Sequence, residues 1–162
     1  LMSTLFTEKG DEVILATRKG QAIRFRESDI REMGRSAGGV RGMKLGKGDI
    51  LIGADVVKKD AKGPMFLVMM ENGFGKRTAL KEYKTQKRGG SGIKTSKVTS
   101  KTGNLMAAQV VTEDMSQIIA MSKKSQVVRV DLANVPSLGR QTQGVRIMKL
   151  RAGDAIASLT CM

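Results

Sequence analysis

Three short apolar runs recur along the chain, at residues 13–16, 65–69 and 118–121. Each is followed by a glycine or serine turn and then by a segment such as "QAIRF" or "QVVRV", in which polar and apolar residues alternate. Alternation with a period of two is typical of a half-buried β-strand. The pattern therefore predicts three hairpins and an all-β fold.

Two sets of positions keep the three hairpins in one register. The hairpin turns at Gly20, Gly73 and Ser125 are 53 and 52 residues apart by subtraction. The same intervals separate a second anchor, in which a glycine precedes an apolar residue and a basic residue: "GVR" from Gly39, "GIK" from Gly92 and "GVR" from Gly144. Self-similarity at a period of this length indicates a repeat architecture.

Each repeat contains a third strand at this second anchor and a fourth after a later turn, "GKGD", "KTGN" or "RAGD". Four strands in about 50 residues is the pattern of a propeller blade. The alternative is a β-sandwich of three hairpin pairs, which the shared register disfavours. Arg41 and Lys44 would face opposite sides of a regular third strand, and a β-bulge there would reconcile their positions.

The repeats divide the chain into blades at residues 12–63, 64–115 and 116–162. Residues 1–11 are expected to be the last strand of a preceding blade and a linker, because "LMSTLF" matches the tail strands: Leu1 and Met2 align with Leu51-Ile52 and Leu105-Met106. On this interpretation the chain is a fragment of a longer array.

The net charge of +14 and the pI of about 10.3 point to nucleic acid or an anionic membrane as a partner. No apolar run approaches the roughly 18 residues that span a bilayer, and no signal segment opens the chain. We therefore expect a cytoplasmic protein without a membrane partner. The single cysteine, Cys161, cannot form an internal disulfide, which suits a reducing compartment.

Composition also narrows the chemistry. The chain has no histidine and one cysteine, which disfavours a zinc site and excludes histidine-based triads and general bases. Four Phe, one Tyr and no Trp disfavour binding by base stacking on aromatic platforms. The one tyrosine, Tyr83, is interpreted as a packing or surface residue. No catalytic or metal-ligating residues are expected.

Glycine-basic loops recur at one position of every repeat: "GRSAGGVRG" from Gly34, "QKRGGSGIK" from Gln86 and "GRQTQGVRI" from Gly139. Glycine permits close backbone approach and leaves amides free for phosphate oxygens, and lysine or arginine releases condensed counterions on binding them. Residues 76–101 alone carry +8 of the +14. An isolated basic loop is usually solvated surface, but this recurrence predicts a curved positive track.

The loops and their surroundings resemble the C-terminal domain of DNA gyrase A. The likeness is carried in order by "GRSAGGVRGMKLGKGD", "ENGFGKRTALKEYKTQKRGGSGIKT" and "LGRQTQGVRIMKL", and it covers essentially the whole chain. It implies a β-pinwheel, a propeller variant of about six repeats in which neighbouring blades exchange a strand. This chain would hold about the last three repeats.

The resemblance also implies a function. In that family the basic rim bends duplex DNA and supports ATP-dependent negative supercoiling by a heterotetramer of two gyrase A and two gyrase B chains. ATP and Mg²⁺ would be used elsewhere in the holoenzyme, with no cofactor in this chain, and the protein partners would be the N-terminal core of gyrase A and the gyrase B protein. The segment from Gln86 to Gly92 matches the family's gyrase A box except at Ser91, and its place after another repeat makes it the related loop of a late blade.

The expected DNA-binding residues lie in the loops and the strands beside them: Arg35, Arg41, Lys44, Lys76, Arg77, Gln86, Lys87, Arg88, Gly89, Gly90, Gly92, Lys94, Lys97, Arg140, Arg146 and Lys149. Two alternatives stay open. One is the C-terminal domain of the topoisomerase IV counterpart of gyrase A, which shares the fold and mainly supports decatenation. The other is a non-enzymatic propeller that binds proteins, which the scarcity of aromatic residues disfavours.

Overall fold

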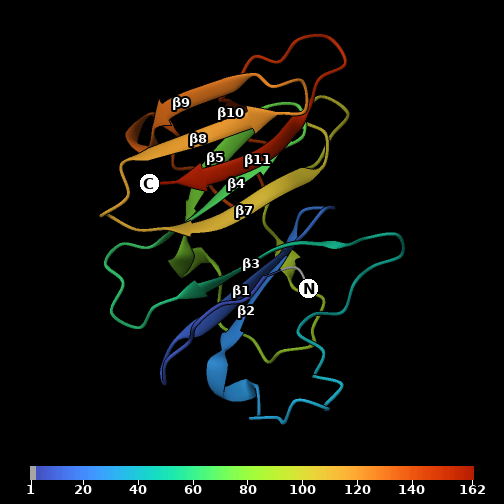
Figure 1. Ribbon diagram of the computed structural model, residues 1–162, viewed down its shortest axis with the longest axis vertical. Helices are drawn as coiled ribbons and strands as arrows, with labels where there is room; N and C mark the ends of the chain where they lie inside the picture. The colour runs from blue at the N-terminus through green and yellow to red at the C-terminus, as the bar shows by residue number, and fades with distance from the viewer. Residues whose placement is uncertain (1–2) are drawn as a thin grey trace.

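The computed structural model describes residues 3–162, and these form three small antiparallel sheets stacked beside one another (Figure 1). The expected tail strand at Leu1 and Met2 lies outside the described residues, and residues 3–8 form no strand. None of the helices in residues 3–162 is long and apolar enough to cross a membrane.

The first sheet contains β1 (Glu12–Thr17), β2 (Gln21–Arg26) and β3 (Leu51–Val57), in the order β3-β1-β2-β6. Its outer strand, β6 (Ile93–Lys94), comes from the second repeat. A one-turn helix, η1 (Glu27–Asp29), follows β2.

The second sheet repeats this arrangement. It contains β4 (Met65–Met70), β5 (Phe74–Ala79) and β7 (Leu105–Val111) in the order β10-β5-β4-β7, and η2 (Leu80–Glu82) follows β5. Its outer strand, β10 (Val145–Arg146), comes from the third repeat.

The third sheet contains β8 (Gln117–Ser122), β9 (Val127–Asp131) and β11 (Ile156–Cys161) in the order β11-β8-β9, with η3 (Leu132–Asn134) after β9. Each repeat therefore keeps three strands, and the second and third each send a fourth to the sheet before. The predicted four-stranded blades are present in the first two sheets, and the strand exchange implied by the resemblance is confirmed. Residues 40–41, the corresponding segment of the first repeat, form no strand.

The core lies between the sheets. The apolar run of β4 is buried from Phe66 to Met70 because alternate side chains pack against different neighbours. Phe66 and Val68 join a cluster with Ile14 of the first sheet, whereas Leu67 packs with Ile118 of the third. A continuous apolar run is what a strand covered on both faces requires. Met69 and Met70 of β4 fill part of this core, in a chain with few aromatic residues.

Candidate nucleic-acid interface

The donated strands attach at the turns of the hairpins before them. The carbonyl oxygen of Gly20 accepts two successive amides, from Thr95 at 2.9 Å and from Ser96 at 3.4 Å. The carbonyl oxygen of Gly73 does the same for Ile147 at 2.8 Å and Met148 at 3.1 Å. Two residues opposite one are the mark of a β-bulge, so the bulge expected after the shared glycine is present at both junctions.

The bulge places two cations of the second and third repeats on the surface, and the first repeat exposes an equivalent pair. The residue between them, Met43, Ser96 or Met148, is buried and anchors the segment. Two equivalent sets of side chains are exposed as a result: Arg41, Lys94 and Arg146 directly after the shared glycine, and Lys44, Lys97 and Lys149 three residues later. We call these six side chains the rim cations.

Neighbouring glycine loops are bonded to each other through the backbone. The amide of Lys44 donates to the carbonyl of Gly90 at 2.9 Å, and the amide of Lys97 donates to the equivalent carbonyl of Thr142 at 3.0 Å. The bonds fix the backbone beneath two rim cations and leave their side chains in solvent. The track predicted from recurrence is thus held by main-chain contacts between repeats.

The glycines of the second loop serve this packing. Gly89 and Gly92 have positive φ values of 84° and 74°. A Cβ on Gly92 would lie 2.4 Å from the carbonyl oxygen of Ala22, too close for any other residue. The Gly89 amide, which we expected to be free for phosphate, donates to the carbonyl of Gly42 at 2.7 Å, and that prediction is wrong. Gly90 and the half-buried Gln86 lie in the same loop junction, where the Gln86 amide donates to the carbonyl of Arg24.

Lys76 does not lie on the surface, contrary to prediction. It is fully buried, and its ammonium donates to the carbonyls of Gly139 at 2.6 Å and Arg140 at 2.7 Å and to the Thr142 hydroxyl at 3.1 Å. Burial lowers the pKa of Lys76 to about 8; the Glu82 carboxylate opposes this shift, and the Arg140 charge adds to it. Lys76 therefore anchors the third glycine loop from inside.

Arg77 is a second exception. It is half-buried on β5, and its Nε donates to the carbonyl of Val135 at 2.8 Å. Burial lowers its pKa. Its equivalent in the first repeat, Arg24, likewise donates through Nη1 to the carbonyl of Tyr83, at 3.3 Å. These arginines join one blade to the next and are not part of the exposed track.

Arg88 and Arg140 are half-buried and also bind carbonyl oxygens of a neighbouring repeat. The remaining predicted cations, Arg35 and Lys87, are exposed, and neither side chain makes a hydrogen bond within residues 3–162. The structure thus divides the predicted set into exposed cations and residues that hold the loops together.

A cluster that the sequence did not reveal surrounds Phe74. The ammonium of Lys101 lies 5.6 Å from the ring centroid and the guanidinium of Arg146 lies 5.4 Å from it. Such distances allow cation–π attraction, and they bring a third-repeat cation beside one from the second repeat. Lys101 lies in a connection that is two residues longer in the second repeat than in the other two. This extra length is the one feature of the sequence that sets the segment apart.

Tyr83 lies in the core. Its hydroxyl is hydrogen-bonded to that of Thr95, and its ring meets Phe66 edge-on at 5.5 Å between centroids. Burial raises the pKa of its phenol. The interpretation as a packing residue is therefore confirmed, and this buried hydroxyl is not presented to a substrate.

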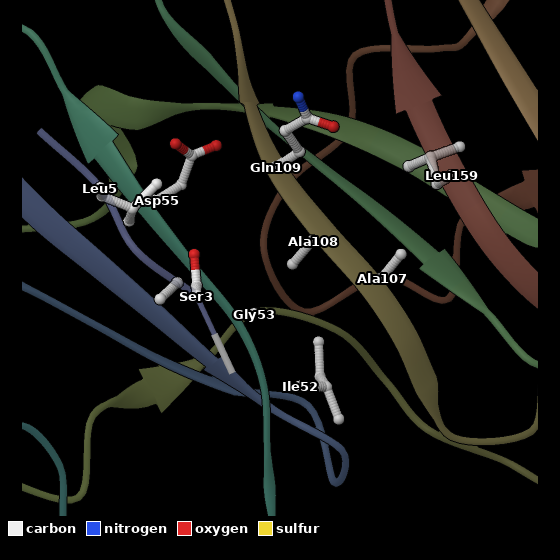
Figure 2. A pocket seen from close by; sticks show the side chains of 10 residues that line it. Ser3, Leu5, Ile52, Gly53, Asp55, Ala107, Ala108, Gln109 and Leu159 are labelled. Atoms are coloured by element: carbon white, nitrogen blue, oxygen red, sulfur yellow. The ribbon is translucent and has the colours of Figure 1, made fainter. Parts of the chain in front are cut away.

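A cavity of about 330 Å³ lies where β3 and β7 run side by side (Figure 2). Asp55 is the acidic group on its wall, and its carboxylate accepts the Val56 amide at 2.8 Å and the Val110 amide at 2.7 Å. Desolvation raises the pKa of Asp55. One oxygen therefore joins β3 to β7, and the other accepts the amide of the next residue on β3. Across residues 3–162, no cluster of three or more histidine, cysteine or acidic side chains could hold a metal ion.

Comparison with known proteins agrees with these repeats. The model of the DNA gyrase C-terminal domain, a β-propeller, matches residues 11–58, 67–112 and 116–161. The chain belongs to this family. It is 39% identical to the DNA gyrase A protein of Aminobacterium colombiense over 154 residues, 95% of the chain and 18% of that protein. It is also 39% identical to the DNA gyrase A protein of Staphylococcus epidermidis over 112 residues, 69% of the chain and 12% of that protein.

Solved structures show the same fold. A structure of the DNA gyrase A C-terminal domain superposes with a TM-score of 0.87 and 32% identity, covering 96% of this chain and 52% of that one. The C-terminal domain of a DNA topoisomerase IV also gives a TM-score of 0.87, at 21% identity, over 96% of this chain and 48% of that one. The gyrase-family chain thus spans under a fifth of the length of the curated relatives named here.

Proposed function

We propose that this gyrase-family chain binds and wraps duplex DNA on the rim cations, as part of DNA gyrase A. The observation that carries the proposal is that every repeat exposes two cations at equivalent positions, and that in the second and third repeats the first of these cations lies on the donated strand. Evenly repeated charges of this kind neutralise backbone phosphates without reading bases. Curvature from blade to blade then favours bent DNA over straight DNA.

The wider assembly is part of the same proposal. The N-terminal core of gyrase A would cleave and pass DNA, and gyrase B would hydrolyse ATP with Mg²⁺, in a cytoplasmic heterotetramer. This chain would contribute the wrapped segment and no catalytic group. The higher identity to a gyrase A domain, 32% against 21%, supports gyrase over topoisomerase IV.

Plasmid topology tests the proposal. The complete protein is bound to relaxed circular DNA, the DNA is relaxed again by a nicking-closing topoisomerase, and the linking-number shift is read on a gel. We expect a shift of constant sign that Arg41→Ala, Lys94→Ala and Arg146→Ala together reduce. A control with Lys9→Ala, Lys59→Ala and Lys62→Ala, which removes the same charge at exposed sites at the other end of the first blade, should retain it.

Two outcomes of this experiment would contradict the proposal. Binding that leaves the linking number unchanged would contradict chiral wrapping and bring the topoisomerase IV alternative forward. An equal loss in the rim variant and in the control would mean that only the overall charge matters, and it would contradict the assignment of the rim.

A further inference from the structure

Two arginines at equivalent positions make the same contact across successive blade junctions. Nη1 of Arg88 donates to the carbonyl oxygen of Arg41 at 2.9 Å, and Nη1 of Arg140 donates to the carbonyl oxygen of Lys94 at 2.9 Å. Arg88 also donates through Nε to the carbonyl of Asp29 at 2.9 Å. In both cases the accepting carbonyl belongs to a rim cation of the preceding repeat.

Each of these contacts is accompanied by a main-chain hydrogen bond two residues further along the same loop. Gly90 follows Arg88 and accepts the Lys44 amide, while Thr142 follows Arg140 and accepts the Lys97 amide. One loop therefore holds the backbone of both rim cations of the repeat before it, one through a guanidinium and the other through a carbonyl. The guanidinium of Arg88 has N–H groups at fixed directions and reaches two carbonyls at once, those of Arg41 and Asp29, a geometry that a lysine ammonium would not reproduce at this site.

We propose that Arg88 and Arg140 are positioning residues, which set the spacing of rim cations from blade to blade and thereby the path of the DNA. They act through Arg41 and Lys94, and they do not themselves neutralise phosphates. The inference rests on the proposed function, because spacing matters only if the rim binds DNA. It departs from the sequence-based prediction, which assigned both arginines to phosphate contacts.

Local exposure supports this division of roles. Arg88 and Arg140 are half-buried and bonded to backbone, so a phosphate cannot draw them away without breaking those bonds. Lys87, adjacent to Arg88, is exposed, and its side chain makes no hydrogen bond within residues 3–162. Lys87 is free to follow a phosphate, and it provides a matched comparison for a true contact.

The first test uses the complete protein with Arg88→Lys and Arg140→Lys together. These changes keep both charges but remove the planar guanidinium groups. We expect the linking-number shift to fall below half of the wild-type value while the slope of log K against log salt is retained. Lys87→Ala should instead lower that slope by about 0.9, the value for one lost phosphate. Arg129→Lys, at an exposed site on β9 whose side chain is bonded to Gln117 of the same sheet, should change neither quantity.

A second test needs no DNA and so separates this inference from the proposed function. Amide hydrogen exchange should accelerate about tenfold at Lys44 in Arg88→Lys and at Lys97 in Arg140→Lys, because local opening becomes easier. Each variant should leave the other junction unchanged. If the double variant does not fold, the single variants still allow the comparison.

Two results would overturn the inference. One is unchanged exchange at Lys44 and Lys97 in the lysine variants. The other combines two observations. The lysine variants would wrap DNA as wild type does, and Arg88→Gln and Arg140→Gln would each lower the slope of log K against log salt by about 0.9, as expected for a lost phosphate contact.

Discussion

The outer edges of the first two sheets differ from that of the third. β2 and β5 each receive a donated strand, whereas β9 receives none within residues 3–162. The turn residues before these strands are Gly20, Gly73 and Ser125, and all three have positive φ, at 82°, 81° and 61°. The three turns therefore share one backbone conformation, although two of them have glycine at this position and the third has serine.

The donated strand explains the difference. A Cβ on Gly73 would lie 2.1 Å from the carbonyl oxygen of Met148, and one on Gly20 would lie 2.8 Å from that of Ser96. Ser125 is exposed, and no segment of residues 3–162 pairs with the strand beside it as the donated strands do. The residue two positions after each turn changes in the same direction, from Ala22 and Gly75 to Val127. Small residues thus mark the edges that accept a strand.

The largest expected effect comes from adding a side chain at a filled edge. Gly73→Ala combines a positive φ with a backbone clash, so we expect it to lower the free energy of unfolding by roughly 3–5 kcal/mol. Ser125→Ala, the matched change at the open edge, should cost less than about 0.5 kcal/mol. Urea denaturation measures both, and similar losses would contradict the role of the donated strand.

An intermediate effect is expected at Lys76, whose equivalents on β2 and β9 are Ile23 and Val128. The pKa of Lys76 is lowered from 10.5 to about 8, so between these values the unfolded chain binds the proton more strongly. The folded state therefore gains stability from this residue as pH rises, and loses it as pH falls through about 8. Relative to Lys76→Met, we expect wild type to gain about 2 kcal/mol between pH 7 and 9.5.

Urea unfolding of both proteins at the two pH values measures this gain, and groups common to both cancel in the difference. Val128→Met is the matched control at the open edge and should show no pH-dependent difference from wild type. A constant difference between wild type and Lys76→Met would mean that the three acceptors around the ammonium keep its pKa near normal.

The smallest effect is expected at the open turn. Ser125→Gly relieves a positive φ without removing a packed group, and it should raise the free energy of unfolding by about 0.5–1 kcal/mol. Thermal unfolding measures this small gain. A loss instead would show that the Ser125 side chain makes a stabilising contact.

The hairpins and the equivalent spacing of the rim cations could be predicted because alternation and spacing report them directly. Strand exchange could not be derived from the same patterns, since a two-residue strand such as β6 carries no signal of the sheet it joins. Lys76 was misplaced because a lysine is normally solvated. Alignment of the repeats contained the missing signal, because Ile23 and Val128 at the same position are aliphatic. Neither composition nor periodicity indicates that the Arg88 side chain is hydrogen-bonded to backbone carbonyls of the first repeat.

The most direct test of the account compares two triple variants by the salt dependence of their DNA binding. Lys44→Ala, Lys97→Ala and Lys149→Ala remove equivalent rim cations, whereas Lys9→Ala, Lys59→Ala and Lys62→Ala remove the same charge at exposed sites at the other end of the first blade. The rim variant should lower the slope of log K against log salt by about 2–3, and the control should leave it within about 0.5. Equal reductions in the two variants would contradict a DNA-binding rim built by strand exchange.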